Sequence, residues 1–400
     1  MKASTPLLVK NDAPQAVVTR ILKNILNRII HEGDLLLILP DGSQLPFGNQ
    51  GTPVRVQIRD WKTCWQIVLN PDLAIGEAYM DGRLRVLQGN IYDFLDLCLM
   101  NLGRGNGIWI RQIQQKIRWL CRRFMMHNPI GKSQKNVAHH YDLSDRLYEL
   151  FLDPDRQYSC AYYKSADDTL EQAQENKKRL IAAKLLLAPD QKILDIGSGW
   201  GGLAFYLAKQ AGVNVTGLTL STEQLRYATR QSEEQKLAER VKFFLRDYRQ
   251  ESGHYDRIVS VGMFEHVGVG NYNRYFAKIA SLLTKDGVAL VHTIGCANRP
   301  SAPQPWIAKY IFPGGYIPSL SEIVPAIERS GLIITDLEVL RLHYAQTLKE
   351  WRHRFLKTCI RSPPFMMKDF AECGSFILPP VKPVFGITVW LFFNFSFQRR

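Results

Sequence analysis

The first hundred residues combine one long amphipathic stretch with several short apolar runs. Residues 16–31 carry eight aliphatic side chains at helical spacing with basic residues among the other positions, which predicts an amphipathic helix. Three short apolar runs follow, separated by turn-forming residues. These runs, each expected to be a strand, are 35–39, 54–58 and 64–69. With a turn and short helix over 71–84, they predict a small α+β domain covering residues 1–100.

From about residue 141 the pattern changes to short apolar runs that alternate with helical stretches such as Glu223–Lys236 and Tyr272–Leu283. The runs are rich in β-branched residues, which favours strands. They are 192–197, 213–219, 240–245, 255–261 and 287–294. Regular alternation of strand and helix predicts an α/β fold with a doubly wound, mostly parallel sheet.

A glycine-rich turn, LDIGSGWGG at 194–202, follows the first of these strands and opens a helix near Leu203. Glycines let the backbone approach a bound cofactor, and the N–H groups of the helix start point at it. The G-x-G-x-x-G spacing alone also fits a dinucleotide site. Two details argue against a nicotinamide enzyme: Asp195 precedes the first glycine, and the second strand ends in Thr219, where such an enzyme carries an acidic residue for the ribose.

Composition narrows the class of protein further. The 400 residues are 46% hydrophobic and 22% charged, which fits neither a disordered chain nor an integral membrane protein. The 51 Lys and Arg exceed the 37 Asp and Glu and leave a formal charge of +14, so anionic partners such as nucleic acid or anionic lipid are favoured. Seven cysteines without a C-x-x-C pair indicate neither a disulfide framework nor a zinc site. With no signal-peptide pattern at the N-terminus, we expect a cytoplasmic protein.

The positive charge is concentrated between Leu97 and Tyr141, where there is no Asp or Glu. Residues 101–138 are therefore interpreted as a basic linker between two domains. Its basic residues are interleaved with aromatic ones, including Trp109 and Trp119. One reading is a solvated linker helix. The other is an amphipathic element that meets anionic lipid headgroups, with Trp at the interface and Arg toward phosphate.

Several motifs of the second half occur together and in order. They are HHYDLSDRLYELFLD at 139–153, YSCAYY at 158–163, LDIGSGWGGLA at 194–204, GLTLSTEQ at 217–224, RDY at 246–248, YDRIVSVGMFEHVG at 255–268, NYNRYF at 271–276, LVHTIG at 290–295 and WIAKYIFPGGYIPS at 306–319. This set resembles the S-adenosylmethionine-dependent methyltransferases, and more narrowly the cyclopropane-fatty-acyl-phospholipid synthase family. The resemblance implies a Rossmann-like catalytic domain over 139–400, and GEAYMDGRL at 76–84 is similar to the family's N-terminal lipid-contacting module.

The resemblance implies transfer of a methylene from S-adenosylmethionine to a cis double bond of a phospholipid acyl chain. It also implies a peripheral protein on the anionic inner face of the cell membrane, and it leaves homodimer formation open. Two alternatives stay open, a methyltransferase that yields a methyl branch and an inactive lipid-binding relative. A nucleic-acid methyltransferase is disfavoured because the chain has neither an Asn-Pro-Pro-Tyr-like motif nor a recognised RNA-binding module.

Candidate site residues follow from the same resemblance. For the cofactor, Tyr158 and Ser159 are expected at the methionine end, with the remaining contacts at Asp195, Gly197, Ser198, Gly199, Gly201, Gly202, Thr219, Gln224, Asp247 and Tyr248. For the base, a bound bicarbonate is implied, held by Cys160, Glu265, His292, the Ile294 backbone and Tyr344, with Cys373 beside the active site. Taken without the resemblance, His292 reads as a core histidine, Cys160 as a buried apolar residue and Tyr344 as a packing residue. No metal is expected, because His139 and His140 lack a third ligand.

The chain departs from the family after Cys373. The apolar run from Val384 to Phe397 is shorter than the roughly 20 residues that span a bilayer, so we expect a strand region there rather than a tail anchor. The inactive alternative rests on this divergence, because a poorly closed pocket would admit water.

Overall fold

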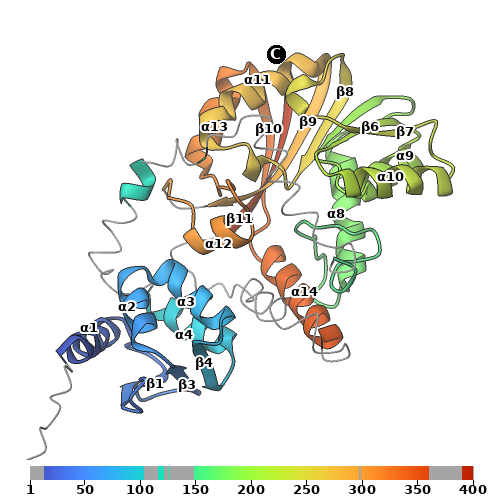
Figure 1. The fold of residues 1–400 in the computed structure, drawn as a ribbon. Coiled ribbons are helices and arrows are strands. Elements are labelled where there is room, and N and C mark those ends of the chain that lie inside the picture. The colour runs from blue at the N-terminus through green and yellow to red at the C-terminus, as the bar shows by residue number, and fades with distance from the viewer. Residues whose placement is uncertain are drawn as a thin grey trace, which may run out of the picture. The chain divides into compact units, whose positions relative to one another are not determined.

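The structure of this chain is a computed structural model that divides into two compact units, residues 1–114 and 115–400 (Figure 1). It describes residues 13–102, 116–120, 126, 148–296, 299–359 and 390–399. Most of the predicted linker 101–138 therefore lies outside the described residues, although 116–120 are helical. The domain boundaries drawn from the sequence stay a prediction.

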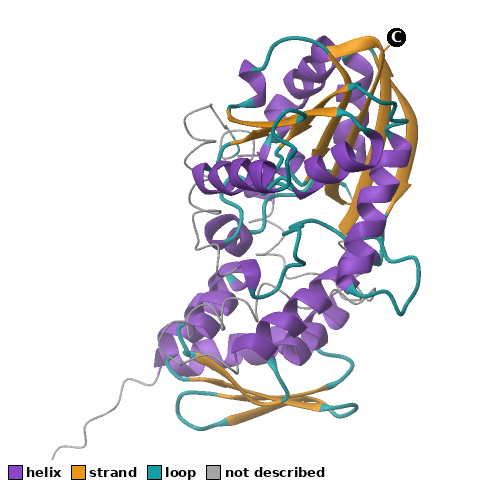
Figure 2. Cartoon of the chain, turned by 90° about the vertical axis from the view of Figure 1, so that its right-hand side faces the viewer, coloured by secondary structure: helices purple, strands orange, loops and turns teal. Residues whose placement is uncertain are grey.

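The first unit is built on a four-stranded sheet with the order β2-β1-β3-β4. Its strands are β1 (Asp34–Ile38), β2 (Gln44–Gly48), β3 (Pro53–Ile58) and β4 (Leu84–Gln88). Its helices are α1 (Ala13–Ile29), α2 (Trp61–Leu69), α3 (Pro71–Met80) and α4 (Ile91–Leu102). Figure 2 shows these helices gathered on one face of the sheet, which confirms the predicted α+β domain.

The prediction of a strand over 64–69 is wrong, because these residues lie in α2. The side chain of Asp60 starts this helix by accepting a hydrogen bond from the N–H of Thr63 at 2.8 Å. Cys64 and Val68, one helical turn apart, are the buried apolar positions. Apolar content alone predicted a strand here, whereas the buried residues are spaced as in a helix. The helices α1 and α3 and the strands β1 and β3 confirm the other predictions, and β2 and β4 were not foreseen.

The second unit carries a seven-stranded sheet with the order β10-β11-β9-β8-β5-β6-β7. The strands are β5 (Lys192–Ile196), β6 (Asn214–Thr219), β7 (Val241–Leu245), β8 (Tyr255–Val261), β9 (Leu283–Cys296), β10 (Leu332–Val339) and β11 (Trp390–Arg399). The five strands from β5 to β9 pair in parallel, whereas β11 runs antiparallel to both of its neighbours. The chain leaves β5 toward β6 and later returns on its other side as β8. This reversal creates the switch point at which open α/β sheets bind ligands.

Helices cover both faces of the seven-stranded sheet (Figures 1 and 2). The helices on the faces are α8 (Leu170–Lys184), α9 (Gly202–Ala211), α10 (Thr222–Glu234), α11 (Tyr272–Leu282) and α13 (Leu320–Arg329). Two further helices, α12 (Pro305–Tyr310) and α14 (His343–Cys359), lie beyond the ends of the strands in Figure 1. Successive strand residues point to opposite faces, so Leu290 packs with α8 and α9 while Val291 packs with α11 and α13. The predicted doubly wound α/β fold is confirmed.

The C-terminal residues complete the sheet. Strand β11 lies between β9 and β10 and pairs with β9 from Trp390–Cys296 to Gln398–Val288. This confirms the strand expected near the end of the chain. Cys373 and the rest of 360–389 lie outside the described residues. Within the ranges that the structure describes, no helix is long and apolar enough to cross a membrane.

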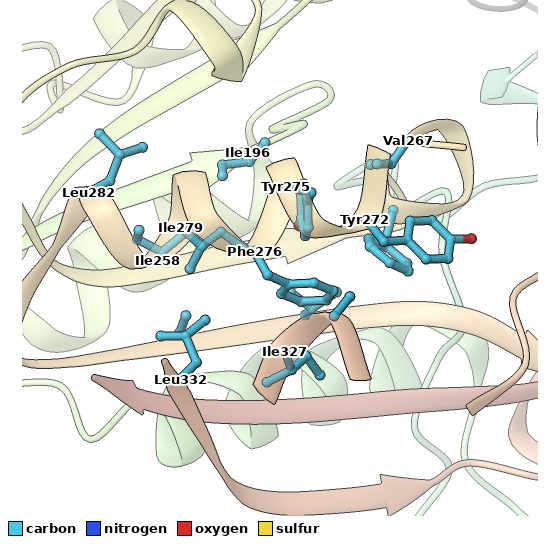
Figure 3. Close-up of a cluster of buried hydrophobic side chains, with 14 of the residues drawn as sticks. Ile196, Ile258, Val267, Tyr272, Tyr275, Phe276, Ile279, Leu282, Ile327 and Leu332 are labelled. Atoms are coloured by element: carbon cyan, nitrogen blue, oxygen red, sulfur yellow. The ribbon is translucent and has the colours of Figure 1, made fainter. Parts of the chain in front are cut away.

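One hydrophobic cluster packs a face of the sheet against α11 and α13 (Figure 3). Phe276 of α11 is fully buried at its centre, and its ring lies 5.4 Å from that of Phe264 and 5.1 Å from that of Tyr275. Phe264 immediately precedes Glu265 in a short 3-10 helix, η2 (Phe264–His266), so this cluster supports the segment that follows β8.

We predict that Phe276→Ala lowers the free energy of unfolding by about 3–5 kcal/mol, because it leaves a cavity in a close-packed core. The matched substitution Phe244→Ala removes a ring that is 38% exposed at the sheet edge, and it should cost less than about 1 kcal/mol. Urea unfolding followed by circular dichroism measures both. Equal losses for the two variants would show that the cluster is not the core that the structure indicates.

Candidate active site

A cavity lies at the carboxyl ends of β5, β6, β7 and β8, on both sides of the switch point. It is lined by residues 155–159, 195–200, 202, 203, 218–220, 224, 246–249, 261–263, 266, 267 and 313. All but one of the predicted cofactor residues line it. The exception is Gly201, which is the N-cap of α9. The structure therefore brings the predicted cofactor set together in one place.

The glycine turn between β5 and α9 needs glycine for its backbone conformation. Gly197, Gly199 and Gly201 have φ values of +86°, +56° and +89°, in the left-handed region that side chains disfavour. At Gly202 the limit is space instead, because a Cβ there would lie 2.7 Å from the carbonyl oxygen of Asp155. The turn thus packs directly against the segment 155–159, and together they form one wall of the cavity.

Asp195 at the end of β5 is a buried carboxylate on the cavity wall. Its Oδ2 has no hydrogen-bond partner among the described residues. Burial raises its pKa to about 7, because the charged form loses its water. A buried acceptor without a partner is costly, so this oxygen suits a ligand that brings N–H or O–H donors.

The ends of β6 and β7 supply the rest of the predicted cofactor set. Thr219 donates its hydroxyl hydrogen to Oε1 of Gln224 at 2.8 Å. The carboxylate of Asp247 accepts from Nε and Nη2 of Arg249 at 2.8 and 2.6 Å, so this side chain is held in place before any ligand arrives. Tyr248 packs edge-on against Tyr275 of the core cluster.

Several cavity residues were not identified from the sequence. They are Asp155, Arg156, Gln157, Arg246, Arg249, Met263 and Pro313, besides apolar residues of the sheet. Asp155, Arg156, Gln157 and Arg249 flank identified motifs, so extending each motif by up to three residues would have found them. Arg246, Met263 and Pro313 lie inside the motifs at 246–248, 255–268 and 306–319, but the motifs alone did not assign them to the cavity.

A second cluster of predicted residues lies next to this cavity. Cys160 and Ile294 are buried together with Leu340, and Tyr344 packs against them. The N–H of Ala161 donates to Oγ1 of Thr347 at 3.0 Å, which ties the segment after Ser159 to α14. Residues from three distant parts of the chain, YSCAYY, β9 and α14, therefore meet as the resemblance implies.

Glu265 is a buried carboxylate in η2, just beyond the end of β8. The last residue pair between β8 and β9 is Val261–His292, and the N–H of Ile294 beyond it donates to Oε1 of Glu265 at 2.7 Å. Oε2 has no hydrogen-bond partner among the described residues. Burial raises the pKa of Glu265 to about 7, opposed by the bond from Ile294.

Of the other predicted base-holding groups, Cys160, His292 and Ile294 are buried and Tyr344 is half-buried. Burial raises the pKa of the Cys160 thiol and the Tyr344 hydroxyl well above their ordinary values, so neither group ionises near neutral pH. His292 is fully buried and lies on the same face of β9 as Ile294. No group of three or more potential metal ligands occurs in the described part of the chain, and His139 and His140 fall outside it.

Comparison with known proteins places this geometry in a family. The sequence model of the family described as mycolic acid cyclopropane synthetase matches residues 130–365. The cyclopropane-fatty-acyl-phospholipid synthase of Escherichia coli is 38% identical over 77% of this chain and 78% of its own length. A probable fatty acid methyltransferase of Pseudomonas putida is 34% identical over 79% of each chain.

Solved structures agree with the sequence relatives. The cyclopropane synthase MmaA2 from Mycobacterium tuberculosis superposes with a TM-score of 0.63 at 32% identity, covering 68% of this chain and 99% of that one. The mycolic acid cyclopropane synthase CmaA1 complexed with SAH and CTAB gives a TM-score of 0.61 at 31% identity, with the same coverage. The chain therefore belongs to the mycolic acid cyclopropane synthetase family and is an enzyme of the S-adenosylmethionine-dependent methyltransferase class.

Proposed function

We propose that this chain is a cyclopropane-fatty-acyl-phospholipid synthase, which adds a methylene from S-adenosylmethionine across a cis double bond of a phospholipid acyl chain. The observation that carries the proposal is the buried carboxylate of Glu265. One of its oxygens is held by the Ile294 N–H and the other has no partner among the described residues. This group lies beside a cavity whose shape and polar groups suit the cofactor. The E. coli relative with this activity in its name supports the choice of substrate.

The cavity residues fit S-adenosylmethionine, which supplies an electrophilic methyl group when bound. The left-handed glycines let the backbone approach the nucleoside, and Asp195 offers an unused acceptor. Thr219 and Gln224 suit the ribose, and Asp247 with Tyr248 the adenine, because they follow β6 and β7 at one end of the cavity. The methionine part then extends toward residues 155–159 and the segment after β8.

An alkene is a weak nucleophile, so the chain must hold it in line with the methyl group in a site without water. Aromatic side chains at the boundary between the two clusters suit the carbocation that follows, through the negative face of each ring. Tyr158 lines the cavity and stacks on Trp351 with ring centroids 5.2 Å apart. Tyr344 meets the same Trp351 edge-on at 6.4 Å.

Ring closure requires removal of a proton from the added methyl group. A bicarbonate held beside Glu265 would supply the base. Oε2 of Glu265 would accept its hydrogen bond, and Cys160, Tyr344 and the Ile294 backbone would line its pocket. Oε1 already accepts from the Ile294 N–H, so the proton of a neutral Glu265 would sit on Oε2 and make that oxygen a donor; the ionised form is therefore the one that suits the base.

The substrate lies in a membrane, so the enzyme needs a way to reach it. We infer peripheral attachment to anionic phospholipid at the cytoplasmic face, through the first unit and the basic stretch 101–138. The formal charge of +14 supports this, as do the exposed side chains in the described part of the stretch. Ile117, Trp119 and Leu120 are 55%, 43% and 68% exposed beside Lys116. Apolar and aromatic groups mixed with basic ones suit a headgroup interface.

The function is tested by incubating the purified chain with S-adenosylmethionine and vesicles of a cis-unsaturated phospholipid, with and without anionic lipid. Lipid mass and proton NMR report the product. A gain of one CH₂ with cyclopropyl signals is expected, faster on anionic vesicles and slowed by salt. The same gain with a methyl branch would overturn cyclisation, and unchanged lipid with bound cofactor would indicate an inactive relative. Equal rates on neutral and anionic vesicles would contradict attachment of the enzyme through anionic lipid.

We predict that Glu265→Gln keeps the affinity for S-adenosylhomocysteine within about twofold but lowers turnover by about 10²-fold or more. Without the carboxylate the base would be lost or misplaced, and the effect should match the loss of an acid–base group. Calorimetric titration and product formation measure the two effects. Glu328→Gln, at an exposed position of α13, is the control and should change neither. A variant that loses cofactor affinity but keeps its rate would show that Glu265 serves the cofactor instead.

We also predict that turnover rises with pH through about 7, because burial raises the pKa of Glu265 and protonation would turn its Oε2 from an acceptor into a donor. Asp195 and Lys177 also have pKa values near 7. Glu265→Gln leaves Asp195 and Lys177 in place. If Glu265 causes the rise of rate with pH, the residual single-turnover rate of this variant should not rise through pH 7. Rates are measured at constant bicarbonate concentration. An unchanged profile in the variant would assign the rise to another group.

A further inference from the structure

Helix α8 presents two polar side chains to the protein interior. Gln174 and Lys177 lie about one turn apart, and each is only 1% exposed. A buried ammonium or amide is costly unless it is hydrogen-bonded. Neither residue lines the cavity or belongs to a motif identified from the sequence. Their burial must therefore be explained by hydrogen bonds to other parts of the protein.

Both side chains bind the same short segment of the cavity wall. Nζ of Lys177 donates to Oε1 of Gln157 at 2.8 Å and to Oγ of Ser159 at 2.6 Å. Nε2 of Gln174 donates to the carbonyl oxygens of Gln157 and Ser159 at 3.1 and 3.0 Å. Helix α8 thus holds two alternate residues of the wall by side chain and by backbone.

The wall would not keep this shape unaided. Arg156 has a φ of +52°, a left-handed conformation that is uncommon for a residue with a side chain. Such a backbone persists only where its surroundings determine it. Two bonds fix Gln157, the residue after Arg156. Its N–H donates to Oδ1 of Asp153 at 2.9 Å, and its side chain accepts from Nζ of Lys177.

The bonds of Lys177 do not depend on its charge. Burial lowers its pKa to about 7, opposed by the nearby carboxylate of Asp153. A neutral amine still has two N–H groups, one for Gln157 and one for Ser159. In its charged form the same group places a cation directly behind the Ser159 hydroxyl.

The hydrogen bond from Lys177 also determines where the Ser159 hydroxyl can donate its hydrogen. Its oxygen accepts from Nζ, so its own hydroxyl hydrogen is directed elsewhere. No described residue accepts that hydrogen, and Ser159 lines the cavity. Its neighbour Tyr158 and Tyr344 both pack on Trp351. Tyr344 in turn packs against Ile294, whose N–H binds Glu265, so this wall lies toward the segment after β8.

We propose that Lys177 is a positioning residue for the carboxylate of the cofactor's methionine part, because it fixes the Ser159 hydroxyl as a donor into the cavity and supplies a cation behind it. The inference rests on the proposed cofactor site and extends it to a residue that does not itself touch the ligand. A carboxylate gains most from a donor that is preorganised and backed by positive charge.

The test compares two nucleosides that differ in the amino-acid part, S-adenosylhomocysteine and 5′-methylthioadenosine, by calorimetric titration. Lys177→Met should lower the affinity for S-adenosylhomocysteine about tenfold, as expected for a charge-assisted bond, and leave methylthioadenosine within about twofold. Lys184→Met is the matched control in the same helix, since its partners Asp336 and Glu338 lie on β10. Equal losses for both nucleosides would mean that Lys177 only supports the fold.

Ser159→Ala removes the acceptor of the Lys177 hydrogen bond and so tests the same interaction. It should show the same selective loss, and adding Lys177→Met to it should cost little more, because the two residues act as a unit. Lys177→Gln keeps an N–H donor and should recover part of the affinity, which also covers the case in which the methionine variant fails to fold. Fully additive losses overturn the proposal. If the unaltered chain binds neither nucleoside, the proposed cofactor site fails instead.

Discussion

Two carboxylates are buried at the carboxyl ends of the parallel strands, and the loss of their hydration is the constraint that the rest of this structure has to meet. Asp195 after β5 and Glu265 after β8 each lose their water on folding, and each keeps one oxygen without a partner in the described residues. Leaving such acceptors unsatisfied destabilises the fold, so the surrounding core has to offset the cost. The cluster around Phe276 lies directly beneath η2 and supplies part of that packing. A site that is unfavourable by itself is stable because it is anchored on a rigid sheet.

The last strand of the chain links this site to residues far away in sequence. His292 and Ile294 lie in β9, whose two neighbours are β8 and β11. Without β11, β9 would be an edge strand with unpaired backbone groups, and its carboxyl end would be free to shift. The position of the Ile294 N–H, and with it the Glu265 side chain, therefore depends on residues 390–399. The divergent C-terminal segment still provides this strand.

The parts of the fold that sequence analysis predicted correctly are those with a strong local pattern. The glycine turn needs left-handed backbone, and the central strands β5, β6, β8 and β9 are largely buried on both faces, so both features have a clear local sequence pattern. The run 64–69 was misread because apolar content does not separate a short helix from a strand. Lys177 left no signal, since a lysine in a helix usually faces solvent. Its role depends on the segment 155–159, which packs on α8 only in the folded chain.

The charges around the reacting centre are distributed in a way that suits cation chemistry. Burial keeps the Cys160 thiol and the Tyr344 hydroxyl protonated near neutral pH, so neither adds negative charge or acts as a nucleophile that the methyl group could alkylate. Glu265, with a pKa of about 7, is the carboxyl of this cluster whose charge can change near neutral pH. An ionised Glu265 would offset the positive charge that develops on the acyl chain, and it would do so at the edge of the pocket, where it can orient a base without capturing the cation itself. Separating the charge that stabilises the cation from the group that takes the proton favours ring closure over trapping of the cation.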